Sequence, residues 1–116
     1  MNASEIISGF ILELRRGILT ICVLSKLNEP TYGYNLVEKL SRNGVSVEAN
    51  TLYPMLRRME SQGLIQSTWN TESAKPRKYY STTEDGRYTL ELLKQHWYSI
   101  VQKTNIILEE DSDNGK

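Results

Sequence analysis

The sequence predicts a mainly α-helical protein with one small β-hairpin and a long C-terminal helix. Three observations lead to this prediction. Apolar residues recur at helical spacing in four segments, two short segments rich in β-branched and aromatic residues follow the third of these, and glycine or proline residues separate the segments. With 116 residues, of which 39% are hydrophobic and 24% are charged, the chain is expected to fold as one domain.

The first two helices are predicted from apolar spacing and end signals. Residues 4–27 form the first, with Ser4 as its candidate N-cap, and its second half is apolar on nearly every side. We therefore expect protein to cover both faces of that half. Thr31 is the candidate N-cap of the second helix, which ends at Gly44.

The third predicted helix begins between Glu48 and Asn50 and ends at Gly63. It contains Pro54, and a proline in a helix interior costs about 3 kcal/mol. We place Pro54 near the first turn, where most backbone N–H groups have no intrahelical partner, so that the cost is small.

Two short strands are predicted over residues 64–70 and 77–83, joined by the loop 71–76. Three helices followed by a strand, a basic loop and a strand describe a winged helix-turn-helix. In that fold the third helix enters the DNA major groove, and the loop, called the wing, reaches a neighbouring groove or phosphates. Residues 1–83 are thus interpreted as a DNA-binding domain whose first helix also takes part in dimer contacts.

The last helix is predicted over residues 84–108, with Thr83 as its cap and an acidic first turn. Its apolar residues are spaced alternately three and four apart, which is the pattern of a helix that packs along a second helix. The simplest partner is the same helix of a second subunit, together with the first helix. The predicted dimer-interface residues are Leu90, Leu93, Trp97, Ile100, Val101, Thr104 and Ile107.

Charge is unevenly distributed along a chain whose formal net charge is zero. Residues 31–83 hold seven basic and four acidic groups, a balance of +3, whereas residues 109–116 hold four acidic groups and one lysine, a balance of −3. We interpret residues 109–116 as an acidic, disordered tail. The basic middle segment indicates a nucleic-acid partner, although the same side chains on one helix alone would also suit a solvated face.

Three sequence stretches, "YGYNLVEKL", "TLYPMLRRMESQGLI" and "KPRKYYSTTEDGR", in this order and spacing, resemble the PadR family of bacterial transcription regulators. The resemblance covers roughly residues 14–108, and the short chain with one helix after the wing is similar to the family's small subgroup. It implies a homodimeric repressor that binds inverted repeats in double-stranded DNA and senses aromatic or multidrug-like compounds.

The resemblance also implies roles for individual residues. Tyr53 matches the signature at the start of the recognition helix, Gly33 allows close helix packing, and one of Tyr79 and Tyr80 is expected in the core by strand alternation. Glu48 departs from the family pattern, because a small capping residue is common there. The predicted DNA-binding residues are Tyr32, Tyr34, Lys39, Asn50, Thr51, Tyr53, Arg57, Arg58, Lys75, Arg77 and Lys78.

Trp97 is the candidate effector-binding residue. In some short relatives of this kind, a tryptophan in the equivalent stretch lies at the dimer centre and stacks on flat ligands. The alternative is a tryptophan packed as dimer core. Val101 stands where an acidic residue would favour a cationic compound, so the sequence favours a neutral aromatic effector.

Enzyme functions are disfavoured, because His96 is the only histidine and Cys22 the only cysteine. Metal-ligand clusters, Cys–His pairs and phosphate-binding glycine loops are therefore not predicted, and no cofactor is expected. The sequence shows no secretory signal and no membrane-spanning run, so a cytoplasmic protein is expected. A winged helix used only for protein contacts is the alternative function, and the basic recognition helix and wing argue against it.

Overall fold

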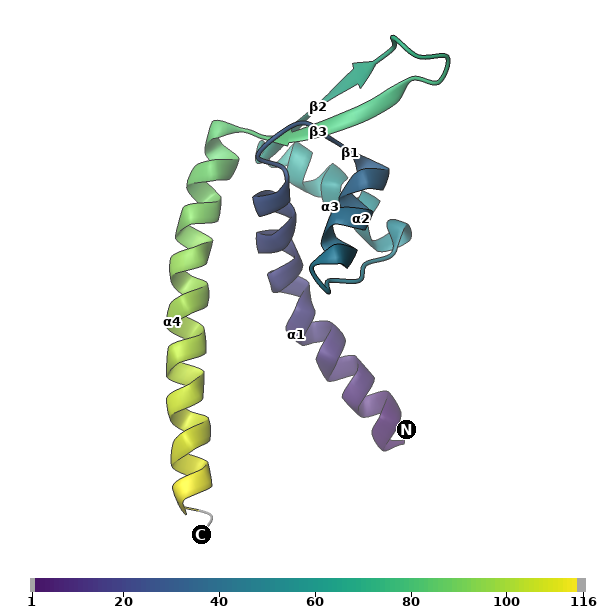
Figure 1. The fold of residues 1–116 in the computed structure, drawn as a ribbon. Helices are drawn as coiled ribbons and strands as arrows, with labels where there is room; N and C mark the ends of the chain where they lie inside the picture. The colour runs from purple at the N-terminus through teal and green to yellow at the C-terminus, as the bar shows by residue number, and fades with distance from the viewer. Residues whose placement is uncertain (1, 115–116) are drawn as a thin grey trace.

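The computed structural model describes residues 2–114 and contains four helices and three strands within that range. The elements in chain order are α1 (Ala3–Lys26), β1 (Thr31–Tyr32), α2 (Gly33–Arg42), α3 (Ala49–Ser61), β2 (Ile65–Asn70), β3 (Arg77–Thr82) and α4 (Glu84–Asn114). The helix α1 and the longer helix α4 lie side by side near one end and diverge toward the other (Figure 1). We call β1, α2, α3, β2 and β3 the winged unit, and it packs against α1.

The sheet is antiparallel with the strand order β1-β3-β2, so the expected hairpin has a third strand. Thr31 pairs with Tyr80 in this strand and is buried there, so its prediction as an N-cap is wrong. The N-cap of α2 is Tyr32, which makes no capping hydrogen bond through its side chain. The Thr31 Oγ1 instead donates to the Glu29 carbonyl over 2.9 Å.

One hydrophobic core joins the C-terminal half of α1 to α2, α3 and the base of the sheet. The third helix carries apolar residues at helical spacing, and they form one buried stripe of Leu52, Met55, Leu56 and Met59, as expected for an amphipathic helix. Thr82 attaches the sheet to α1, because its N–H donates to the Leu27 carbonyl and its Oγ1 to the Leu24 carbonyl. The core residues are Leu19, Val23, Leu24, Leu27, Leu36, Leu40, Leu52, Met55, Leu56, Met59, Ile65, Tyr80 and Leu90.

Capping explains where α1 and α4 begin. The Asn2 side chain accepts from the Glu5 N–H, so Asn2 rather than Ser4 caps α1. The Thr83 Oγ1 accepts from the Gly86 N–H over 3.0 Å, which confirms the predicted cap of α4. Gly86 lies so close to the Leu64 carbonyl that a Cβ atom would overlap it.

The other ends of two helices differ from the predictions. α4 continues to Asn114 instead of ending near residue 108, because no glycine or proline interrupts the chain after its first turn. The predicted disordered tail is therefore helical through residue 114, and residues 115–116 lie outside the described residues. Pro54 is the sixth residue of α3, beyond the first turn, so its missing N–H leaves the Asn50 carbonyl without its usual donor. Burial of the apolar side of α3 offsets this loss.

Among the described residues, no helix has both the length and the apolar character that crossing a membrane requires.

Candidate nucleic-acid interface

Tyr53 lies where α2, α3 and the sheet meet. A Cβ atom on Gly33 would lie 2.8 Å from the Tyr53 Oη, so only glycine leaves room for this ring at the start of α2. Burial raises the pKa of Tyr53 above 10.0, and the neighbouring phenols of Tyr32 and Tyr80 raise it further. Tyr53 is therefore a neutral, half-buried side chain that packs against the start of α2.

Around Tyr53, the polar side chains of the helix-turn-helix are exposed. Tyr34 at the start of α2 is 60% exposed, and the α3 side chains of Asn50, Thr51, Arg57 and Arg58 are exposed as well. Within the described residues, none of these side chains makes a hydrogen bond or an ion pair with another part of the chain. Their donors remain available to an external partner.

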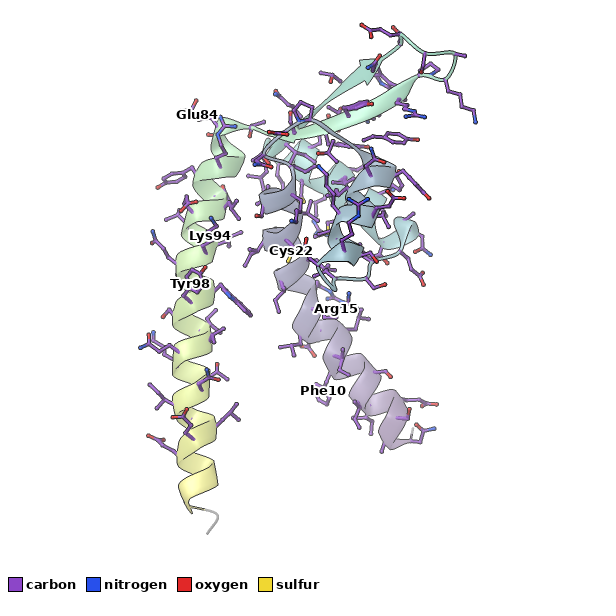
Figure 2. All side chains as sticks on the ribbon, in the orientation of Figure 1. Phe10, Arg15, Cys22, Glu84, Lys94 and Tyr98 are labelled. Carbon is purple, nitrogen blue, oxygen red and sulfur yellow. The ribbon has the colours of Figure 1, made fainter. Side chains whose placement is uncertain are left out.

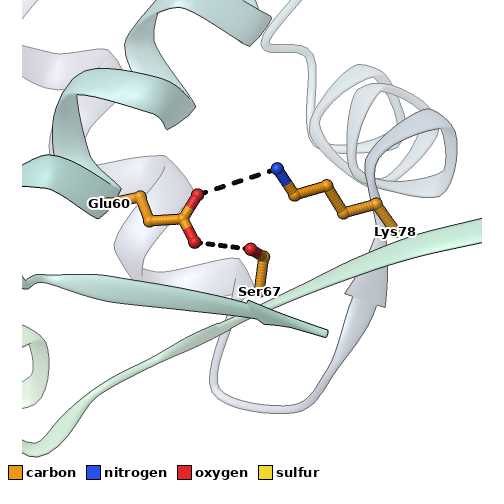
Figure 3. Close-up of polar contacts among 3 residues, drawn as sticks. All are labelled: Glu60, Ser67 and Lys78. Atoms are coloured by element: carbon orange, nitrogen blue, oxygen red, sulfur yellow. Dashed lines mark hydrogen bonds and ion pairs between the residues drawn. The ribbon is translucent and has the colours of Figure 1, made fainter. Parts of the chain in front are cut away.

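The wing carries its two adjacent basic side chains on opposite faces of β3. The Arg77 guanidinium carbon lies 5.1 Å above the Tyr32 ring, and that ring lies 6.0 Å from the Tyr79 ring. Lys78 lies on the other face, with its Nζ 3.8 Å from the Glu60 Oε1 of α3 (Figure 3). Arg77 and the loop residue Lys75 are exposed, whereas Lys78 is half-buried.

Strand alternation places Tyr80 in the core and leaves Tyr79 half-buried, as predicted. Burial raises the pKa of Tyr80, the Glu60 carboxylate raises it further, and the Arg57 guanidinium partly counteracts both. Arg57 and Glu60 therefore both lie near the base of the wing.

Lys39 differs from the exposed residues. Its side chain is half-buried, and its Nζ donates to the Thr31 Oγ1 over 3.3 Å. Among the predicted contacts, Lys39 and Lys78 thus already have partners within the chain. The sequence alone gave no sign of this, because both contacts depend on how a helix and a strand pack in the folded chain.

The second candidate region is a groove of about 420 Å³ between α1 and α4. Its walls are apolar, with the charged Glu13 and the polar His96 among them. Trp97 forms part of it and is 36% exposed. The lining residues are Glu13, Leu14, Gly17, Ile18, Ile21, Leu93, His96, Trp97 and Ile100.

The predicted dimer-interface residues fall into two groups along α4. Leu90 is 9% exposed and packs in the core of its own chain, and its contact with a second chain stays a prediction. Leu93 is half-buried against the same core. Farther along, Ile100 and Ile107 are 58% and 57% exposed, because α4 extends beyond the winged unit.

The first half of α1 carries a large apolar surface, and none of its residues was among the predicted dimer-interface residues. Phe10, on the part of the helix that diverges from α4 (Figure 2), is 67% exposed, and Leu14 is 71% exposed. Soluble chains rarely expose apolar patches of this extent without a partner. The signal was present in the spacing of Ile7, Phe10, Ile11 and Leu14.

The described residues contain no group of three or more histidine, cysteine, aspartate or glutamate side chains placed to hold a metal ion. Cys22 is half-buried and packs against the core.

The fold is that of a winged helix-turn-helix with a long C-terminal helix, and comparison with known proteins gives its family. Residues 21–92 match the model of the transcriptional regulator PadR-like family. The chain is 33% identical over 79 residues to a transcriptional regulator of Mycobacterium tuberculosis, covering 67% of this chain and 74% of that protein. The chain therefore belongs to the PadR-like family, as the resemblance predicted.

Solved structures agree with this assignment. A PadR family transcriptional regulator from Eggerthella lenta is 48% identical with a TM-score of 0.85, over 91% of this chain and 95% of that one. A PadR-like transcriptional regulator from Bacillus cereus is 35% identical with a TM-score of 0.73, over 83% and 96% of the two chains. Members of this family are DNA-binding transcriptional regulators rather than enzymes, and they typically form dimers.

Proposed function

We propose that the protein is a homodimeric repressor that binds an inverted-repeat operator. The observation that carries this proposal is the set of exposed, unpaired polar and basic side chains on α3 and the wing, centred on Tyr53. Each chain offers one recognition helix. Two such helices about 34 Å apart would read half-sites one helical turn apart.

The proposed DNA contacts divide by position. Side chains along the exposed side of α3 would read base edges in the major groove, and those at its margin and on the wing would bind phosphates. Tyr32 and Lys39 would support this surface from within. The proposed base-reading residues are Asn50, Thr51, Tyr53 and Arg57, and the proposed phosphate contacts are Tyr34, Arg58, Lys75 and Arg77.

The proposed dimer contact combines the exposed half of α1 with the outer part of α4. Phe10 and Leu14 would cover Trp97, Ile100 and their neighbours on the second chain, which removes apolar surface from water in both subunits. The α4 residues of this contact are Trp97, Ile100, Val101, Thr104 and Ile107.

Binding of the dimer to DNA is tested by selecting a duplex from a random-sequence library and titrating it with the protein. Affinity should fall steeply as salt increases, because phosphate contacts release counterions. Arg58→Ala should lower the magnitude of the salt slope by about 1. Arg16→Ala is the matched control, since Arg16 is exposed on α1, outside the elements proposed to touch DNA, and it should leave the slope unchanged. Failure of the wild-type chain to select any duplex would refute the proposal.

For the effector, we propose a planar aromatic compound that stacks on Trp97 in the groove between α1 and α4 and releases the DNA. The sequence favours a neutral compound because Val101, rather than an acidic residue, lies one helical turn after Trp97. Glu13 nevertheless lies in the groove wall, and its carboxylate would attract a positively charged ring system. A positively charged aromatic compound therefore fits the groove better than the sequence, which favoured a neutral one, had suggested.

The effector proposal is tested by Trp97 fluorescence in a Trp69→Phe background, with size-matched cationic and neutral aromatics in the absence of DNA. Saturable quenching is expected, stronger for the cationic compounds, and Glu13→Gln should remove that preference. The control Glu5→Gln changes the same charge on α1 outside this groove. Absence of saturable quenching across the series would leave Trp97 as dimer core.

A further inference from the structure

Glu60 contacts both strands of the wing from the end of the recognition helix. Its Oε1 lies 3.8 Å from the Lys78 Nζ on β3, and its Oε2 accepts a hydrogen bond from the Ser67 Oγ on β2 (Figure 3). One carboxylate on α3 is therefore shared by the two strands. We call Glu60, Ser67 and Lys78 the wing clamp.

The wing clamp is partly shielded from water. The side chains of Lys78 and Glu60 are 33% and 34% exposed, compared with 76% and 46% for the ion pair of Arg42 with Glu38 on the surface of α2. The Lys78 Nζ also lies 5.5 Å from the centre of the buried Tyr80 ring, which restricts the position of the ammonium group. Partial desolvation strengthens an ion pair relative to a fully exposed one.

Lys78 and Arg77 are adjacent in sequence but differ in what they contact. Because successive strand residues point to opposite faces, Arg77 stacks on Tyr32 on the outer face while Lys78 turns toward α3. A lysine already bound to a carboxylate releases few counterions from DNA. Arg77 has no acidic partner among the described residues and remains able to bind a phosphate.

The orientation of the wing matters because the wing and α3 touch DNA at different places. The hairpin projects well beyond the helical unit, so a small rotation at its base moves its tip far (Figure 1). Specific binding requires α3 in its groove and the wing on phosphates at the same time. Non-specific binding tolerates many relative positions.

We propose that Lys78, predicted from the sequence as a direct DNA contact, is a positioning residue. With Glu60 and Ser67 it fixes the angle between the wing and the recognition helix, and Arg77 makes the phosphate contact. This inference rests on the proposed DNA binding. Glu60, although acidic, would thereby contribute to the specificity of the protein for its operator.

The test compares Lys78→Met with Arg77→Met, which remove the same charge from neighbouring positions on opposite faces of β3. Affinity is measured against salt for a duplex selected by the wild-type protein and for a random-sequence duplex. Arg77→Met should reduce the magnitude of the salt slope by about 1 on both duplexes. Lys78→Met should leave both slopes unchanged and lower the ratio of specific to random affinity about two- to fivefold, the range of a single partly exposed ion pair.

Exchange of the two charges separates positioning from general loss of structure. Glu60→Lys alone should lower the affinity ratio, and the double variant Glu60→Lys with Lys78→Glu should restore most of it. The inference is overturned if Lys78→Met reduces the salt slope as much as Arg77→Met, or if the exchange restores nothing. DNA binding by the wild type would stand in either case, whereas a wild type that binds no duplex would remove the proposed function as well.

Discussion

The winged unit and the two helical arms use their apolar residues in opposite ways. In the winged unit, Leu36, Leu52 and Leu56 are fully buried, and the proposed DNA contacts lie on the polar surface. In the first half of α1 and the outer part of α4, large apolar side chains remain exposed, as with Leu14 at 71% and Ile107 at 57%. The winged unit buries its apolar residues within one chain, whereas the arms leave theirs exposed, where a second chain would cover them. We therefore expect substitutions in the winged unit to act on the proposed DNA contacts and substitutions in the arms to act on the proposed dimer.

The largest effect is expected for Trp97→Ala, which tests the arms. If Trp97 is dimer core, the free energy of dimer unfolding should fall by about 3–5 kcal/mol, the range for truncating a large buried aromatic. Denaturant unfolding at several protein concentrations gives this value. A variant that remains a stable dimer, binds DNA and ignores aromatic compounds would instead assign Trp97 to the effector groove.

The next prediction compares one substitution in the two regions. Leu36→Ala should lower the free energy of unfolding by about 2–5 kcal/mol at every protein concentration, because the cavity lies inside one chain. Leu14→Ala should weaken dimerisation, so its effect should depend on protein concentration. Sedimentation and denaturant titration distinguish the two. Concentration-independent loss in both variants would mean that α1 packs within its own chain.

A smaller effect is expected on the polar surface of the winged unit. Arg57→Ala should reduce discrimination between the selected duplex and single-base variants by about 1–3 kcal/mol, because one base contact is lost. Tyr53→Phe should weaken operator binding without loss of folding, since the ring still fills the space beside Gly33. Circular dichroism and competition binding provide the measurements. If both variants still distinguish the selected duplex from its single-base variants as well as the wild type does, α3 is not the recognition helix.

The smallest effect concerns alkaline pH. The pKa values of Tyr53 and Tyr80 are raised above 10.0 in the folded chain, so the unfolded chain loses these protons first. Their stabilising contribution is then complete below about pH 10 and is lost as pH rises through the folded-state pKa values. Tyr53→Phe and Tyr80→Phe should each flatten the fall in denaturant midpoint above that pH. An identical fall in the double variant would contradict the burial of these phenols.

Much of the fold could be predicted from periodicity and helix-end signals, because these are local. The buried stripe of α3, the Thr83 cap and both long strands followed directly from the residues. The strand β1 could not be predicted, since two residues carry no periodicity and Thr31 is equally suited to a cap. Its pairing with β3 depends on contacts made only in the folded chain.

The site was predicted less completely, for a related reason. The sequence indicates which residues are basic, but not which of them already have a partner. Lys78 and Arg77 are indistinguishable in the motif, and only the approach of Glu60 from α3 separates them. Leu90 packs in the core of its own chain, and heptad spacing alone cannot tell a contact of this kind from a contact between two chains.

The central claim, that two copies of this chain read an inverted repeat, is tested most directly by the symmetry of the DNA that the protein selects. Random-library selection, followed by hydroxyl-radical footprinting and measurement of the mass of the complex, gives the answer. For a homodimer on an inverted repeat, we expect a two-fold symmetric sequence, two chains per duplex, and protected regions about one helical turn, roughly 34 Å, apart. An asymmetric site bound by a single chain, or selection of no sequence at all, would contradict it.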